Sequence, residues 1–250
     1  GQNHVIGRVL TVTIIQVTLI FAVVTCASVQ DATGPVAPIA TTKQTAYHHP
    51  FAWAELIDYA HPELWTTPGP LTYISDEHWS DVVGEIGQDV IERKDEQFVS
   101  AVHAYMRRRF RGYAAGGALV AKRNVDRIID EGTLSGCHDW GLVLTAVLRR
   151  AGVPAVYVDT VWVPWAREAV AGTTRNSIGH IFVEAYIGER WVLVNSTDSC
   201  VTDPYDPLCP HFRADTAPRL GETFFVLFKG LDPKHYGISE IGELTAAMKS

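Results

Sequence analysis

The chain has 250 residues, of which 47% are hydrophobic and 20% are charged, a composition typical of globular proteins and not of disordered ones. Its formal net charge is -7 at pH 7. Because affinity for nucleic acids depends on clustered Lys and Arg, we expect no nucleic-acid partner. One basic run, Arg107, Arg108, Arg109 and Arg111 before Gly112, is typical of a helix end, where cations face the last carbonyl groups.

Residues 1–30 differ in composition from the rest of the chain. The stretch from Val9 to Ala27, VLTVTIIQVTLIFAVVTCA, contains no charged residue. It approaches the roughly 20 residues that span a bilayer, so a cleaved signal peptide and an uncleaved membrane anchor both fit, and a buried element of the fold is the alternative. Arg8 precedes the stretch and predicts that the remainder crosses the membrane. We expect an extracytoplasmic protein, secreted or membrane-anchored, with membrane contact only through residues 9–27.

Residues 31–50, DATGPVAPIATTKQTAYHHP, are rich in Pro, Ala and Thr, which predicts an extended linker. A single folded domain is expected over residues 51–250. Helical spacing of apolar residues predicts helical segments within residues 76–113, 120–131 and 137–152. Runs of β-branched and aromatic residues predict strands at 155–163, 179–186, 191–197 and 224–228. Helices followed by an antiparallel sheet make an α+β fold.

Cys137 begins the last of these predicted helices. Backbone N–H groups without helical partners and the positive end of the helix dipole favour a thiolate at this position. If Cys26 belongs to the leader, Cys200 and Cys209 flank the loop VTDPYDPL and can pair as a disulfide in an oxidising compartment, which leaves Cys137 as the free thiol. The alternative is a small buried side chain without chemistry.

The strands at 179–186 and 191–197 are predicted to form a hairpin that turns at Gly188 and Glu189. This turn pairs Tyr186 with Trp191, Phe182 with Asn195 and His180 with Thr197, and it places His180, Phe182 and Asn195 on one face. Asn195 is therefore expected to hold one ring nitrogen of His180 and to leave the other for the thiol.

Two other residues compete for these roles. Asp198 is the acidic alternative to Asn195, but strand parity puts Asp198 on the opposite face. A register slip of one residue would exchange the two faces. His138 is next to the thiol in sequence, but it lies on a helix, where adjacent residues diverge, so we expect a weaker base there.

These residues resemble the transglutaminase-like superfamily, whose fold is related to that of papain-like cysteine proteases. The resemblance rests on residues 132–158, GTLSGCHDWGLVLTAVLRRAGVPAVYV, on residues 179–197, GHIFVEAYIGERWVLVNST, and more loosely on FFVLFKGLDPKHYGI. It implies a nucleophilic Cys137 and a catalytic His180, with Asn195 in the place of the family's usual aspartate. Papain-like enzymes use Asn in that role. Asp139 matches a frequent acid of the family and is expected to hold the helix start.

The resemblance implies that the Cys137 thiolate attacks a carboxamide or peptide carbonyl, that His180 protonates the leaving amine, and that a thioester forms. The backbone N–H of Cys137 is the expected first oxyanion donor. With water as acceptor the protein is a peptidase or amidase acting on proteins or peptides, which we favour. With an amine as acceptor it is a transamidase, and a non-catalytic binding domain is the third hypothesis.

We expect no cofactor and no metal. The chain has neither a CxxC pair nor an HExxH helix, which are common metal-binding patterns. Asp198, Asp203 and Asp206 could gather a calcium ion, but they lack the EF-hand pattern. An acidic loop closed by a disulfide is the interpretation that we favour.

Overall fold

The computed structural model describes residues 56–112, 116–173, 179–214 and 223–249, all within one compact unit. The expected leader and linker, residues 1–50, lie outside the described residues. Within the described ranges, no helix has both the length and the apolar character needed to cross a membrane.

The first part of the described chain is helical, and its polar residues explain where the helices begin. The helices are η1 (Pro62–Thr66), α2 (Asp76–Ile86), α3 (Gln88–Arg93), α4 (Glu96–Arg109), η2 (Gly116–Leu119) and α5 (Val125–Glu131). Ser75, Asp95 and Asn124 cap α2, α4 and α5 by accepting hydrogen bonds from first-turn N–H groups. Gly87, at φ 95°, separates α2 from α3, so residues 76–109 form three helices.

Helix α6 (Cys137–Arg150) begins at the predicted residue and ends two residues before the predicted end, where Gly152 adopts φ 76°. Four strands follow at the predicted places: β3 (Ala155–Trp162), β4 (Gly179–Ile187), β5 (Arg190–Asn195) and β8 (Thr223–Gly230). Two short strands, β6 (Val201–Thr202) and β7 (His211–Arg213), complete an antiparallel sheet in the order β6-β5-β4-β3-β8-β7. The predicted α+β fold is thus confirmed.

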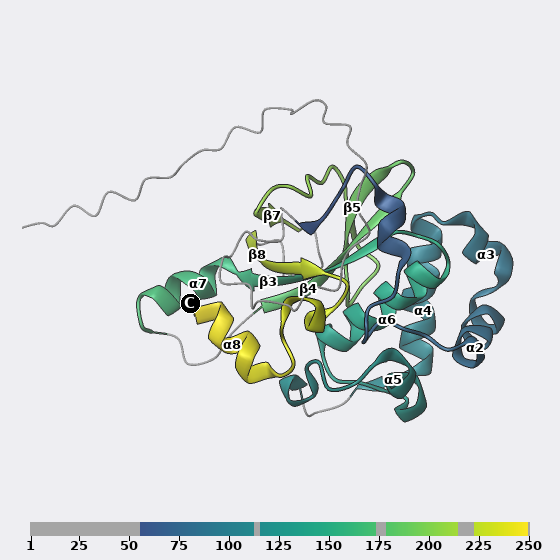
Figure 1. Ribbon diagram of the computed structural model, residues 1–250, viewed down its shortest axis with the longest axis horizontal. Coiled ribbons are helices and arrows are strands. Elements are labelled where there is room, and N and C mark those ends of the chain that lie inside the picture. The colour runs from purple at the N-terminus through teal and green to yellow at the C-terminus, as the bar shows by residue number, and fades with distance from the viewer. Residues whose placement is uncertain (1–55, 113–115, 174–178, 215–222, 250) are drawn as a thin grey trace, which may run out of the picture. The chain divides into compact units, whose positions relative to one another are not determined.

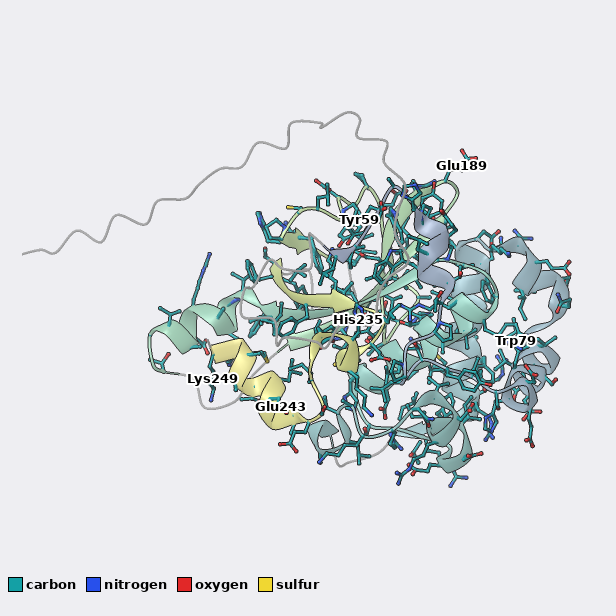
Figure 2. All side chains as sticks on the ribbon, viewed as in Figure 1. Tyr59, Trp79, Glu189, His235, Glu243 and Lys249 are labelled. Atoms are coloured by element: carbon teal, nitrogen blue, oxygen red, sulfur yellow. The ribbon has the colours of Figure 1, made fainter. Side chains whose placement is uncertain are left out.

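Several elements were not predicted from the sequence. They are α7 (Val163–Val170), η3 (Pro233–Tyr236), α8 (Ile241–Lys249), and a two-residue parallel pairing of β1 (Arg111–Gly112) with β2 (Thr133–Leu134). Figure 1 shows α2 to α5 gathered at one side of the sheet and α7 and α8 at the other. Figure 2 shows Glu243 and Lys249 on α8 far from Trp79 on α2.

The sheet is covered on both faces, and strand alternation divides its residues between two hydrophobic cores. On one face Tyr157, Val161, Ile181 and Val183 pack with the helices. On the other face Val158, Phe182, Leu193, Phe224 and Val226 form a second core with Phe212 and Trp65. Burial of each large apolar side chain contributes about 1.5–3 kcal/mol.

Helix α6 lies directly on β3 and β4, because Gly141 lets its backbone approach them. A Cβ atom added at Gly141 would overlap Cγ2 of Ile181 and would lie 2.9 Å from Cε2 of Tyr157. Glycine in a helix interior costs about 1 kcal/mol relative to alanine. The close approach offsets that cost and fixes the distance between the start of α6 and the sheet.

Candidate active site

Cys137 is the first residue of α6, and its N-cap residue is Gly136, at φ 112° and ψ -177°. That φ is rare for residues with a side chain, so glycine is needed to turn the chain into the helix at this point. The Cys137 side chain is half-buried. Two hydrogen bonds hold the start of α6: Tyr157 Oη donates to the His138 carbonyl (3.4 Å) and Ser196 Oγ donates to the Cys137 carbonyl (3.3 Å). A third joins β3 to β4, from Thr160 Oγ1 to the His180 carbonyl (2.8 Å).

The turn before Cys137 is held by the buried carboxylate of Asp139. Its Oδ2 accepts hydrogen bonds from Ser135 N (2.8 Å) and Ser135 Oγ (2.9 Å), and it forms an ion pair with the buried Arg123. Arg123 also donates to Thr133 Oγ1 (3.0 Å) and pairs with Glu131. Asp139 therefore stabilises the backbone that presents the thiol, as its match to the family's acid implied.

His138 belongs to the same turn and is not free to act on the thiol. Its Nε2 is hydrogen-bonded to Ser135 Oγ (3.1 Å) and lies 3.3 Å from Asp139 Oδ1. Burial lowers the pKa of His138, although the Asp139 carboxylate opposes that effect.

His180 and Asn195 meet in the hairpin as predicted. Phe182 pairs with Asn195 and Tyr186 with Trp191, so the predicted register is confirmed. The Nε2 atom of His180 donates to Oδ1 of Asn195 at 2.7 Å. This hydrogen bond leaves the Nδ1 atom of the neutral imidazole unprotonated, which is the form that a general base requires.

The expectation that Asp198 lies apart from this pair was wrong. Strand β5 ends at Asn195, and the next residues form a turn in which strand parity no longer applies. Nδ2 of Asn195 donates to Asp198 Oδ2 at 3.0 Å, and Cys200 N donates to Asp198 Oδ1 at 2.8 Å. The expected pairing of His180 with Thr197 is not part of the ladder; instead, N and Oγ1 of Thr197 each donate to Asn195 Oδ1 at 3.1 Å.

His103 of α4, which sequence reasoning missed, supports the end of β5. Its Nε2 lies within hydrogen-bonding distance of the carbonyl oxygens of Asn195 (3.1 Å) and Ser196 (3.2 Å), and its Nδ1 lies 3.0 Å from the Val99 carbonyl oxygen. Its ring stacks on Trp140. Burial lowers the pKa of His103. The available signal was a histidine on the apolar face of α4, between Val102 and Met106, both of which are buried.

Cys137 and His180 line one cavity of about 200 Å³. Val120, Ile241, Leu244 and Met248 give the cavity apolar walls, and Asp159 of β3 adds a carboxyl group. In the described part of the chain the thiol makes no hydrogen bond to the imidazole. In resting enzymes such contacts are often long and tighten only when substrate binds.

The electrostatic surroundings of Cys137 correct the expectation of a resting thiolate. Burial, followed by the nearby Asp159 carboxylate, raises the pKa of the Cys137 thiol to about 11. Backbone N–H groups of Ile181, Cys137 and His138 act in the opposite direction but do not outweigh burial. Burial also lowers the pKa of His180, against the effects of Asn195 and Asp198. At neutral pH both groups are therefore uncharged.

Asp159 is a second residue that sequence reasoning missed. It lies in β3 next to a register shift in the pairing with β8, and such irregularities re-aim side chains near sites. Tyr236 Oη donates to Asp159 Oδ2 at 2.6 Å. Tyr236 belongs to η3. His235, the residue before it, lies near the middle of the view in Figure 2. Burial raises the pKa of Asp159 to about 7, and the Tyr236 hydrogen bond opposes this rise. The signal was a single charged residue within the otherwise uncharged and mostly apolar run AVYVDTVW.

The expected disulfide is not formed, since no bond joins Cys200 to Cys209. Cys209 Sγ donates to the His211 carbonyl at 3.0 Å. Cys137 is therefore not distinguished as the one thiol left over, and what distinguishes it is its position at the start of α6. Asp203 of the acidic loop pairs with Arg190. Within the ranges that the structure describes, no group of three or more His, Cys, Asp or Glu side chains is arranged to hold a metal ion.

Comparison with known proteins gives a family match and a similar solved structure. A family model described as "Transglutaminase-like superfamily" matches residues 85–196, which include Cys137, His180 and Asn195. A solved structure, the crystal structure of a "Putative Cysteine Protease" from Cytophaga hutchinsonii, is similar with 16% identity and a TM-score of 0.46, over 73% of this chain and 50% of that one. This chain thus spans half the length of the matched structure. No curated protein matches the chain.

The resemblance to the transglutaminase-like superfamily is confirmed over residues 85–196. The fold agrees with this resemblance. Helices precede an antiparallel sheet, and a cysteine begins the helix that packs on that sheet. These findings support a cysteine-dependent enzyme in general.

Proposed function

We propose, from the match of residues 85–196 to the transglutaminase-like superfamily, that this protein hydrolyses peptide or amide bonds through a thioester on Cys137. The observation that carries the proposal is the cavity that Cys137 shares with His180, whose Nε2 is held by Asn195. That hydrogen bond sets the ring orientation and directs the basic nitrogen away from Asn195.

In the first step, Nδ1 of His180 accepts the proton of the Cys137 thiol while the sulfur bonds to the carbonyl carbon. Because the resting thiol is protonated, proton transfer accompanies the attack. The carbonyl oxygen gains negative charge and accepts a hydrogen bond from the backbone N–H of Cys137. The C–N bond then breaks, His180 returns the proton to the leaving amine, and a thioester remains.

In the second step, His180 takes a proton from water as the water oxygen attacks the thioester carbon. The C–S bond breaks, the sulfur regains the proton from His180, and a carboxylic acid is released. Asn195 keeps the imidazole oriented through both steps, and Asp198 in turn holds the Asn195 amide through Nδ2.

Hydrolysis is favoured over transamidation by the carboxyl group of Asp159, which its pKa of about 7 leaves partly ionised at neutral pH. An amine acceptor that enters the cavity meets this carboxyl group. A carboxylate stabilises the ammonium form of the amine, which is not nucleophilic, whereas water is unaffected. A non-catalytic role is the second candidate, and the high pKa of the Cys137 thiol is the observation that favours it.

We further propose that the substrates are proteins or peptides met outside the cytoplasm, after residues 9–27 direct the chain to the membrane. The uncharged stretch from Val9 to Ala27 supports this localisation. Cell fractionation of the tagged full chain, with protease digestion of intact cells, tests it. A protease-protected product in the cytoplasmic fraction would contradict it.

The reaction is tested with denatured, fluorescently labelled casein and with a dansylated primary amine. We expect casein fragments from the natural chain and from Cys209→Ser, and none from Cys137→Ser or His180→Ala. Equal hydrolysis by Cys137→Ser would overturn the proposal. Incorporation of the dansyl group without hydrolysis would establish the transamidase. The absence of both products would favour the non-catalytic domain.

A further inference from the structure

Four carboxylates are buried among the residues that the structure describes, and three of them have the partners that burial demands. Asp139 pairs with Arg123, and Glu184 pairs with Lys229. Asp232 accepts hydrogen bonds from the backbone N–H groups of Leu71 (2.7 Å) and Lys234 (2.9 Å). A buried carboxylate without such partners is strongly unfavourable.

Asp159 is the exception among these four. It is 4% exposed, and in the described part of the chain its polar contact is one neutral donor, the hydroxyl of Tyr236. No Lys, Arg or His of the described chain forms an ion pair with it. Asp159 also lines the cavity that holds Cys137 and His180. Asp159 therefore lies where a substrate would bind, and no cation in the described part of the chain balances the negative charge that it carries when ionised.

The rest of the cavity wall suits a chain of methylene groups. Val120, Ile241, Leu244 and Met248 are apolar, and the volume of about 200 Å³ admits a side chain or a small terminal residue. Sites that bind long cationic side chains combine an apolar wall for the stem with an acid for the charged head. The cavity has both.

We propose that Asp159 is a specificity-determining residue that binds an ammonium or guanidinium group of the acyl donor, next to the carbonyl that Cys137 attacks. This inference rests on the proposed function. The group that Asp159 recognises is a basic side chain, whose methylene stem packs on the apolar wall. It belongs to the acyl donor and not to an acceptor, because an amine held by a carboxylate stays protonated.

Substrate charge then also prepares the nucleophile. The negative charge of Asp159 is the second cause, after burial, of the raised pKa of the Cys137 thiol. A bound cation balances that charge and makes loss of the thiol proton easier. A neutral acyl donor would leave the thiol in its resting, protonated state.

The test uses three thiosulfonate reagents that react with thiols by the same chemistry and differ in charge. They are 2-aminoethyl, 2-sulfonatoethyl and methyl methanethiosulfonate, which are cationic, anionic and neutral. Peptide mass spectrometry gives the rate at Cys137 separately from the rates at Cys200 and Cys209. For each cysteine we compare the labelling rate with the cationic reagent to that with the anionic reagent. In the natural chain we expect this ratio to be about tenfold higher at Cys137 than at Cys209, which is the size expected for one charged hydrogen bond.

Asp159→Asn removes the charge and keeps an acceptor for Tyr236, so we expect it to abolish this preference. Asp203→Asn, which alters an exposed carboxylate on the acidic loop, is the matched control and should retain the preference. If Asp159→Asn fails to fold, the labelling rates of Cys137 with the three reagents in the natural chain are sufficient to test the inference. A natural chain without a preference for the cation, or an Asp159→Asn protein that keeps it, would overturn the inference.

A second measurement separates this inference from the proposed function. N-acetylated coumarin amides of arginine and of citrulline, its neutral isostere, are compared as substrates, so that the charge of the side chain is the one difference between them. We expect kcat/KM to favour arginine by about tenfold or more in the natural chain and to be similar for the two in Asp159→Asn. Hydrolysis of both amides at equal rates by the natural chain would overturn the inference and leave the function intact. If Cys137 prefers the cationic reagent but neither casein nor the amides are hydrolysed, the inference would stand and the proposed function would be overturned.

Discussion

Asn195 uses both ends of its amide group. Oδ1 accepts from His180 Nε2 and from Thr197, whereas Nδ2 donates to Asp198. An aspartate at this position could not donate, and its carboxylate would face that of Asp198. The departure from the family's usual aspartate therefore has a local physical reason, because the amide lets Asp198 sit within hydrogen-bonding distance without repulsion.

Replacing Asn195 by aspartate tests this arrangement. A carboxylate beside the imidazole favours its charged form, so Asn195→Asp should raise the pKa of His180. Because the base must be unprotonated, the acid limb of the kcat/KM profile should move up by about one pH unit. Asn195→Ala should lower activity about tenfold to a hundredfold without that upward shift. An unchanged acid limb in Asn195→Asp would show that His180 is not the base.

The burial of Asp159 should be visible in the stability of the protein. Its pKa rises from 3.8 to about 7 in the folded state, so between these pH values the folded chain holds one more proton than the unfolded chain. The contribution of Asp159 to stability then falls with rising pH, by up to about 1.4 kcal/mol per unit. We expect urea unfolding to show that the free energy of unfolding of Asp159→Asn increases relative to that of the natural chain from pH 4 to pH 7. Above pH 8 the difference between the two should be constant.

Asp203→Asn is the control for this measurement, because Asp203 lies on the surface beside Arg190. The difference between this variant and the natural chain should change little over the same pH range. A parallel pH dependence of the natural chain and Asp159→Asn would contradict the raised pKa.

At the scale of elements, the fit of α6 against the sheet determines where the thiol lies. Gly141→Ala would force α6 away from Ile181 and Tyr157, and overpacking of this kind costs about 1–3 kcal/mol. The same displacement moves Cys137 relative to His180, so we expect kcat to fall by about tenfold or more. Chemical denaturation and casein hydrolysis measure the two effects.

Gly84 of α2 provides a matched control. A Cβ added there meets nothing within 4 Å, so Gly84→Ala should stabilise the protein by about 0.5–1 kcal/mol through its better helix propensity and leave activity unchanged. Stabilisation by both substitutions would mean that α6 does not lie as close to β3 and β4 as described.

The elements that could be predicted from sequence are those with strong local signals. The turn at Gly188 and Glu189 and the alternation of the flanking strands were enough for the register of β4 and β5, and thereby for the His180–Asn195 contact. Helix α8 was missed because it is short and only Leu244 in it is buried. Asp159 and His103 were missed because their partners, Tyr236 and the end of β5, are distant in sequence. Helix-dipole reasoning gave the wrong charge state for Cys137, since burial cannot be measured from sequence.

At the scale of the whole molecule, one buried cluster joins segments from both ends of the described chain. Lys229 of β8 pairs with Glu184 of β4, and Lys229 Nζ also donates to Tyr59 Oη (3.0 Å) and to the Pro207 carbonyl (2.7 Å). Tyr205 Oη donates to Glu184 Oε1 at 2.7 Å. The cluster fastens the segment around Tyr59 and the acidic loop to the second face of the sheet.

Removing one charge of this pair should be costly. Lys229→Met leaves Glu184 buried without a cation, and we expect a loss of about 3–5 kcal/mol in the free energy of unfolding. Arg190→Met breaks the pair with Asp203, in which the arginine side chain is 51% exposed, and should cost at most about 1 kcal/mol. Urea denaturation at pH 7 compares them. Similar losses in the two variants would argue against a tightly buried pair.

The short strands at the two ends of the sheet have a consequence for the proposed action on polypeptides. β6 has two residues and β7 has three, so each of these two outer strands offers few backbone groups to which a foreign strand can add. Extended polypeptides, the substrates proposed for this protein, are also the molecules most able to join an open edge and begin a β-aggregate. Short edge strands leave little backbone for such pairing, so we expect a polypeptide to be bound through its side chains in the cavity and not by addition to the sheet.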